Sequence, residues 1–187
     1  MGKKFNIIAF LNKYKTFLLL GAIGLILFHN YLDIVLIVLL IFLVILALLS
    51  VRVTMMVPHI SIETITASSI LLGYVWGWKI ALGFGLIIGF CAYALNGMLK
   101  LKTIINILLM GLCGVVAAIF ANLHYSFTIA YMLTFLIRLI LNNLIFPLVE
   151  SDWIENMIHS NGDPLFNVLI TFQIMNLIYW LLQILRG

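Results

Sequence analysis

Long apolar runs alternate with short polar breaks along most of the chain. The clearest runs cover residues 34–51, 80–95, 103–121, 127–148 and 165–185. A helix needs about 17–25 mainly apolar residues to cross the hydrocarbon core of a bilayer. Because lipid offers no hydrogen bonds to an exposed backbone, each run is expected to be an α-helix. The pattern predicts an all-α integral membrane protein.

Two segments fit this pattern less simply. Residues 17–29 are apolar but shorter than an ordinary span, so they either cross a thinned membrane or lie at its surface. Residues 61–76 are rich in Ser and Thr, which is unusual for a span. We therefore predict one membrane domain over 1–187, with a basic N-terminus and short apolar helix over 1–32 and a six-helix core over 33–185.

The number of spans stays open between six and seven. Seven spans with the N-terminus inside place most Lys and Arg residues on the inner side, as the positive-inside rule requires. The short length of residues 17–29 favours six spans instead. Either count describes a multi-pass protein, which we expect in the cell membrane.

Small residues recur at helical spacing in two of the runs. Ala81, Gly85 and Gly89 are four residues apart in one run, and Gly111, Gly114 and Ala118 share a face in another. Such rows let membrane helices approach closely, which is a main source of packing energy in lipid. We expect close helix–helix contacts there.

Composition narrows the class of protein further. Of the 187 residues, 65% are hydrophobic and 9% are charged, and the net charge is +4. The lysines beside the apolar runs are explained by topology and by contacts with lipid headgroups. No basic surface interleaved with aromatic residues is visible, so nucleic acid is not an expected partner. The two cysteines lie inside apolar runs without metal-ligand spacing, and we expect no metal and no cofactor.

Arg138 is the most informative single residue. It lies in the middle of the run 127–148, where a bilayer holds it far from water. A charge at that depth costs roughly 2.5–3.5 kcal/mol on insertion scales, so it normally faces a protein interior or a wet cavity. Thr134 and Asn142 lie one helical turn on either side and share its face. These three residues are our first candidates for a ligand site.

Glu63 is the expected partner of Arg138, since each lowers the cost of burying the other. One interpretation is a static salt bridge between two helices. The other is a polar pocket in which Arg138 binds a carboxylate or phosphate with its planar fork and Glu63 binds a cationic or hydroxyl group. Gln173 and Asn176 from the last run either complete the lining of this pocket or join two helices.

Enzyme signatures are missing from the chain. It contains no HExxH, GxSxG, paired acidic metal motif or glycine-rich phosphate loop. We therefore expect a protein that is not an enzyme. Because no ATP site is encoded, active transport requires energy from another subunit or from an ion gradient.

Residues 57–90 (VPHISIETITASSILLGYVWGWKIALGFGLIIGF) have a recognisable outline. A short polar helix ends near a glycine turn at Gly73 and Gly77, and a glycine-rich helix follows. This outline resembles the early core of the substrate-binding S components of energy-coupling-factor transporters. The resemblance implies a six-helix bundle that captures a vitamin-like small molecule, with a membrane coupling subunit and ATPases as partners.

A similar six-helix outline looks like the MreD-type scaffold proteins of the cell-shape machinery, which bind other membrane proteins instead of solutes. The leading prediction is a solute-binding transport subunit, and the scaffold is its alternative. An ion-coupled transporter acting alone is a third possibility. Membrane lipids are expected contacts in every case.

Overall fold

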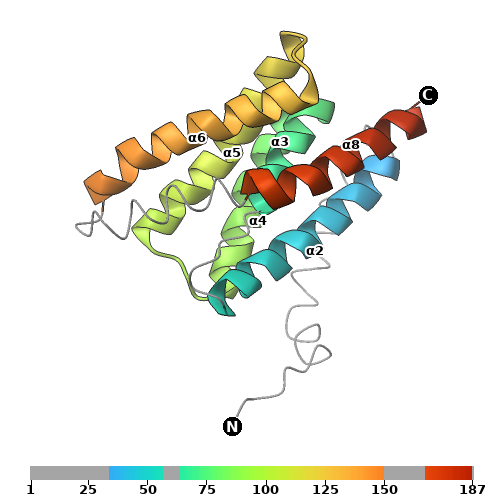
Figure 1. The fold of residues 1–187 in the computed structure, drawn as a ribbon. Helices are drawn as coiled ribbons and strands as arrows, with labels where there is room; N and C mark the ends of the chain where they lie inside the picture. The colour runs from blue at the N-terminus through green and yellow to red at the C-terminus, as the bar shows by residue number, and fades with distance from the viewer. Residues whose placement is uncertain (1–33, 57–63, 150–166, 187) are drawn as a thin grey trace, which may run out of the picture. The chain divides into compact units, whose positions relative to one another are not determined.

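The described residues of the computed structural model are almost entirely helical (Figure 1). They comprise residues 34–56, 64–149 and 167–186. The helices are α2 (Ile34–Met56), α3 (Thr64–Trp76), α4 (Trp78–Leu95), α5 (Leu101–Asn122), α6 (Phe127–Val149), a π-helical turn (Asn167–Thr171) and α8 (Phe172–Arg186). These ranges contain no strand. The predicted all-α class is confirmed.

Five helices in these ranges are long and apolar enough to cross a membrane. They are α2, α4, α5, α6 and the π-turn together with α8. The sixth, α3, has 13 residues and is about 20 Å long at 1.5 Å per residue. The chain is therefore a multi-pass membrane protein by the length and composition of its helices. Residues 17–29 and 150–164 lie outside the described residues, so the choice between six and seven spans stays a prediction.

The chain divides into two compact units, residues 1–42 and residues 43–187, with the boundary inside α2. The second unit contains the other helices and is the one described below. Within it, α2 continues to Met56, past the end expected at residue 51. Ser50 of α2 and Thr64 at the start of α3 are hydrogen-bonded through their hydroxyl groups at 2.7 Å.

The short helix α3 is the central element of this unit. It contacts α4, α5, α6 and α8, and every residue from Thr64 to Gly73 is buried. The hydroxyl-bearing residues of this helix are therefore enclosed by protein instead of facing lipid. This enclosure explains how a segment too polar for an ordinary span fits inside a membrane bundle.

Close packing of α4 on α5 depends on small residues, as the sequence predicts. A methyl group added at Gly85 of α4 would lie 2.6 Å from the Cα atom of Gly111 on α5. One added at Gly114 would lie 2.5 Å from the Cβ atom of Ala81. Such distances are far below van der Waals contact, so the two backbones touch. The predicted close helix–helix packing at these rows is confirmed, and the structure adds that the two rows face each other.

The same face of α5 also receives α3, because a methyl group at Gly73 would meet the carbonyl group of Gly114. The connection between α3 and α4 is a single residue, Gly77, with φ +91°. A residue with a side chain is strained at that angle, whereas glycine is not. Trp76 and Trp78 flank this glycine, which agrees with the predicted turn between two helices.

Two helices end in the same hydrogen-bonded motif. At the end of α5, His124 has φ 60°, its amide donates to Ala121 at 3.0 Å, and the amide of Tyr125 donates to Phe120 at 3.1 Å. This pair of bonds satisfies carbonyl groups that have no partner inside the helix. The rings of Phe120 and Tyr125 also pack edge to face, with 5.6 Å between their centroids. Gly97 gives α4 the same ending.

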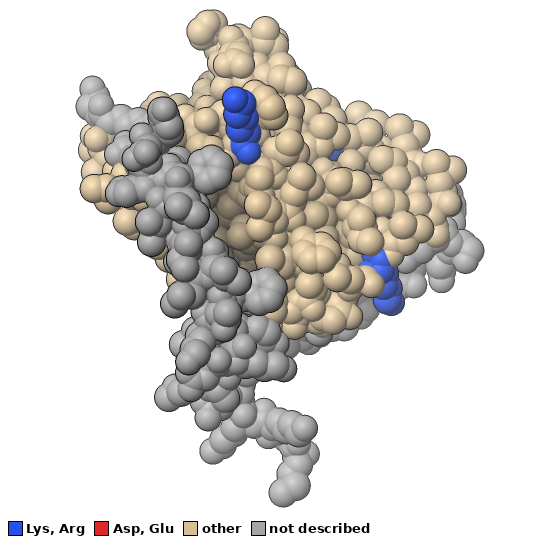
Figure 2. Space-filling view, turned by 180° about the vertical axis from the view of Figure 1, so that it is seen from behind, with Lys and Arg blue, Asp and Glu red and all other residues tan. Residues whose placement is uncertain are grey.

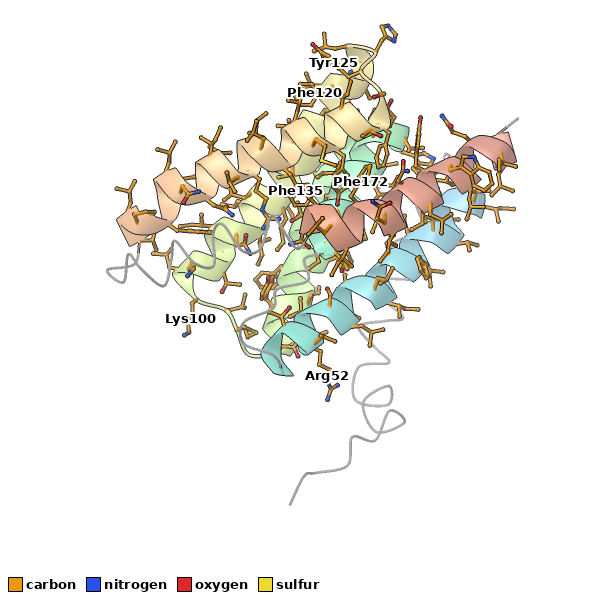
Figure 3. The ribbon with its side chains drawn as sticks, viewed as in Figure 1. Arg52, Lys100, Phe120, Tyr125, Phe135 and Phe172 are labelled. Atoms are coloured by element: carbon orange, nitrogen blue, oxygen red, sulfur yellow. The ribbon has the colours of Figure 1, made fainter. Side chains whose placement is uncertain are left out.

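The two ends of the bundle differ in their side chains. Figure 3 shows Tyr125 and Phe120 at one end, and Lys100 and Arg52 at the other. We call these the aromatic end and the basic end.

Candidate functional site

Arg138 is almost completely buried, with 2% of its surface exposed. It is the twelfth of the 23 residues of α6. One terminal nitrogen donates to the hydroxyl group of Thr66 on α3, and the other donates to Oδ1 of Asn106 on α5 at 2.9 Å. The guanidinium group therefore joins three helices. We call Arg138, Thr66 and Asn106 the arginine centre.

Asn106 extends the arginine centre toward a fourth helix. Its Nδ2 atom lies 3.5 Å from the hydroxyl group of Tyr93 on α4. Thr66 and Asn106 are both neutral, so they orient the guanidinium fork without cancelling its charge. Hydrogen bonds to a charged group are stronger than neutral ones, so these bonds stabilise the position of the guanidinium group.

The arginine centre is close to the basic end of the bundle. Asn106 is five residues after Leu101, the first residue of α5, or about 7–8 Å along that helix. Lys102 lies one turn before Asn106, and its amino group lies over the ring of Phe146, 5.5 Å from the ring centroid. Arg138 is central in its own helix because α6 continues past the start of α5.

Thr134, Arg138 and Asn142 share one buried face of α6, as predicted. Thr134 is fully buried and Asn142 is 4% exposed. The hydroxyl group of Thr134 donates to the carbonyl group of Ala130 at 2.7 Å, one turn back in its own helix. Thr134 therefore has its hydrogen bond satisfied locally. The neighbouring Asn143 is half-buried and donates to Leu139 at 2.9 Å.

Buried polar atoms without a hydrogen-bond partner in the described part of the chain include Oδ1 of Asn142 and the hydroxyl oxygens of Ser68 and Ser69. Buried polar atoms are usually paired, because desolvating an unpaired one costs about 1–3 kcal/mol. Ser69 follows Thr66 by three residues on α3, and Asn142 follows Arg138 by four on α6. Unmet hydrogen-bonding capacity is thus found on both helices that carry the arginine centre.

Glu63 lies outside the described residues, so its pairing with Arg138 stays a prediction. The other acidic residues also lie outside the described residues. They are Asp33, Glu150, Asp152, Glu155 and Asp163. Figure 2 accordingly shows isolated basic side chains on a surface of uncharged residues, and no acidic one. Arg138 is the one buried charged side chain among the residues that the structure describes.

The last helix contributes different polar residues from those expected. Gln173 is exposed and Asn176 is half-buried, whereas Asn167 and Thr171 are each 1% exposed. The physical reason is the π-helical turn before α8, which contains more residues per turn than an α-helix and so changes which side chains face inward. Gln173 therefore does not line a buried site. The buried polar residues of this segment, Asn167 and Thr171, precede it in the chain.

Tyr131 connects this π-turn to the face of α6 that carries Arg138. Its hydroxyl group is 2.9 Å from that of Thr171, and Thr171 in turn donates to the carbonyl group of Asn167. Tyr131 precedes Arg138 by seven residues, or two helical turns, on the same face of α6. Figure 3 shows Phe135 and Phe172 between the two helices at this level.

The sequence argument did not place Thr66 and Asn106 in the site, nor Tyr131 and Thr171 in the contact beside it. Asn106 had a usable signal, because an amide inside an otherwise apolar run must find a partner on another helix. Tyr131 and Thr171 had no such signal in the sequence, because both residue types also occur at lipid-facing positions.

A separate hollow of about 370 Å³ is lined by residues of α3 and α8. Its lining residues are Tyr74, Val75, Tyr179, Leu182 and Gln183. Tyr74 follows Thr66 by eight residues of α3, or about 12 Å, so the hollow does not include the arginine centre. No charged residue lines it.

The guanidinium group of Arg138 is the charged group of the arginine centre. A guanidinium can hold a carboxylate or phosphate through two parallel hydrogen bonds. No group of three or more His, Cys, Asp or Glu residues within 34–56, 64–149 and 167–186 is arranged to hold a metal ion.

Comparisons of this chain with protein-family models, with curated proteins and with solved structures find no match.

Proposed function

We propose that this chain is the membrane-embedded, solute-binding subunit of a transporter, and that Arg138 anchors an anionic group of a vitamin-like small molecule. The observation that carries the proposal is the arginine centre. A buried cation in a membrane bundle is costly, and such residues commonly mark pathways or sites for solutes. Here the cation is oriented from α3 and α5 by neutral groups, which is suitable for recognising an anion.

Unmet hydrogen-bonding capacity near this centre is the second support. Oδ1 of Asn142 lies one turn from Arg138 on the same face and lacks a hydrogen bond in the described part of the molecule. A purely structural polar contact has no need of such an atom. A bound solute would satisfy it and compensate the cost of burying it.

The glycine rows give the scaffold alternative little support. A scaffold would use these rows as surfaces for other membrane proteins. Gly85, Gly111 and Gly114 are instead in contact with backbone and side chains of neighbouring helices in the same chain. Those surfaces are therefore occupied, and the proposal of a solute-binding subunit is the one we retain.

Energy for uptake is assigned to partner subunits, because the sequence encodes no ATP site. The expected partners are a membrane coupling subunit and ATPases. Membrane lipid surrounds the bundle.

The first test is to identify small molecules retained by the protein after gentle detergent extraction, using mass spectrometry. The second is thermal stabilisation of the purified protein by biotin, pantothenate and riboflavin, since a ligand that binds only the folded state raises the melting temperature. We expect a carboxylate-bearing compound to stabilise the protein. At 100 times Kd the gain is about 2.7 kcal/mol.

Arg138→Gln tests the anchor, with Arg52→Gln as a matched control at the basic end. We expect Arg138→Gln to lose at least about tenfold in affinity, because a charge-assisted hydrogen bond contributes about 1.5–3 kcal/mol. Arg52→Gln should bind as the wild type does. Folded Arg138→Gln protein with unchanged affinity would contradict the assignment of the anchor. Absence of any retained or stabilising solute, together with co-purification of membrane proteins, would favour the scaffold.

A further inference from the structure

Among the described residues, the side-chain amide of Asn142 has an unpaired acceptor on the same face of α6 as Arg138. It is 4% exposed, it shares the inward face of α6 with Arg138, and its Oδ1 atom accepts no hydrogen bond in the described part of the molecule. Asn143, the next residue, is half-buried and bonded to Leu139. The two adjacent amides therefore have different surroundings, and only the first has an unsatisfied buried acceptor.

We infer that the solute carries a hydrogen-bond donor, a hydroxyl or N–H group, beside its anionic group, and that Asn142 accepts from this donor while Arg138 binds the anion. This inference rests on the proposed function of the arginine centre. It narrows the solute class from anions in general to hydroxy- or amino-substituted carboxylates and phosphates.

The spacing of the two side chains limits the separation of the two groups on the solute. Residues four apart on a helix have Cβ atoms about 5–6 Å apart. An anion on Arg138 and a donor on Asn142 are therefore separated by a short chain of atoms.

Selection by a donor has a specific advantage inside a membrane. Fatty acids are present in the bilayer and carry a carboxylate that suits an arginine. They have no hydroxyl or N–H group near that carboxylate, so binding one would leave Oδ1 of Asn142 buried and unpaired. A site built around a buried polar group rejects an analogue that lacks the matching group far more strongly than an apolar pocket does.

The test compares two probes that differ only in the donor. They are 4-hydroxybutyrate and butyrate, titrated into purified full-length protein in detergent and followed by ligand-observed NMR. For the wild type we expect 4-hydroxybutyrate to bind about tenfold more tightly than butyrate, the difference expected for leaving one buried acceptor unpaired. Asn142→Leu, which is similar in size and lacks the acceptor, should bind the two probes equally. Asn143→Leu is the matched control and should keep the wild-type preference.

The outcomes separate this inference from the proposed function. If the wild type binds both probes equally and Arg138→Gln loses both, the anionic site stands and the role of Asn142 is overturned. If neither probe binds the wild type, or if Arg138→Gln binds them unchanged, the arginine centre is not an anion site and both proposals fail. If the Asn142→Leu protein does not fold, the wild type decides the role of Asn142. A preference for 4-hydroxybutyrate over butyrate supports that role, and equal binding overturns it.

Discussion

The contact between α4 and α5 allows a sharp test of what holds the bundle together. We consider Gly85→Ala, which adds one methyl group at the closest approach of the two helices, where it would lie 2.6 Å from the Cα atom of Gly111. Gly83→Ala is the matched control. It makes the same change two residues away on the same helix, where nothing lies within 4 Å of the added group.

The magnitude follows from two opposing effects. Replacing glycine by alanine inside a helix stabilises it by roughly 0.5–1 kcal/mol at either position. At Gly85 the helices must also separate by about 1 Å, because carbon atoms in contact are normally about 3.5–4.0 Å apart. Forcing an extra methyl group into a packed interface costs about 1–3 kcal/mol. The helix term cancels between the two variants, so Gly85→Ala should be less stable than Gly83→Ala by about 1–3 kcal/mol.

The assay is reversible unfolding of the purified protein in mixed micelles of a mild detergent and dodecyl sulfate, followed by circular dichroism. We expect Gly83→Ala to unfold at the same or a higher dodecyl sulfate fraction than the wild type, and Gly85→Ala at a lower one. Equal stability of the two variants would refute the reasoning. It would mean that backbone contact between α4 and α5 is not a constraint on the folded state.

Two further predictions concern hydrogen bonds and backbone conformation. In a double-mutant cycle of Tyr131→Phe and Thr171→Val, the free energies of unfolding should give a coupling energy of about 0.5–1 kcal/mol, in the range found for membrane proteins. A coupling energy within error of zero would argue against the hydrogen bond between α6 and the π-turn. His124→Gly should raise the unfolding midpoint, because glycine adopts the positive φ of the α5 ending without strain, whereas Leu123→Gly, at φ −83°, should lower it. The idea fails if both glycine variants lower the midpoint equally.

The helices were predictable from the sequence because their cause is local. An apolar run in lipid has to be helical, and runs such as 127–148 and 80–95 match α6 and α4 closely at their ends. The glycine rows were equally readable, since a small residue every fourth position has few uses other than close packing. The shared face of Thr134, Arg138 and Asn142 follows from helical geometry alone and is present in the structure.

The partners of Arg138 could not be derived in the same way. Which helix faces α6 depends on the packing of the whole bundle, and nothing in the run 103–121 specifies that Asn106 meets a guanidinium group. The surroundings of Gln173 could not be derived for a related reason. A π-helical turn at Asn167–Thr171 has no sequence signature, yet it places Gln173 outside and Thr171 inside.

The position of the arginine centre along α5 has a consequence for how a solute would be handled. Counted along α5, Asn106 of the arginine centre is about 7–8 Å from the basic end and about 24 Å from the aromatic end. If the arginine centre binds a solute as proposed, entry and exit at the basic end would return the molecule to the compartment from which it came. Delivery to the opposite compartment would require the distance to the aromatic end to be opened, so capture and translocation would be separate steps. Under the proposed function, directional movement would therefore have to be driven by another component.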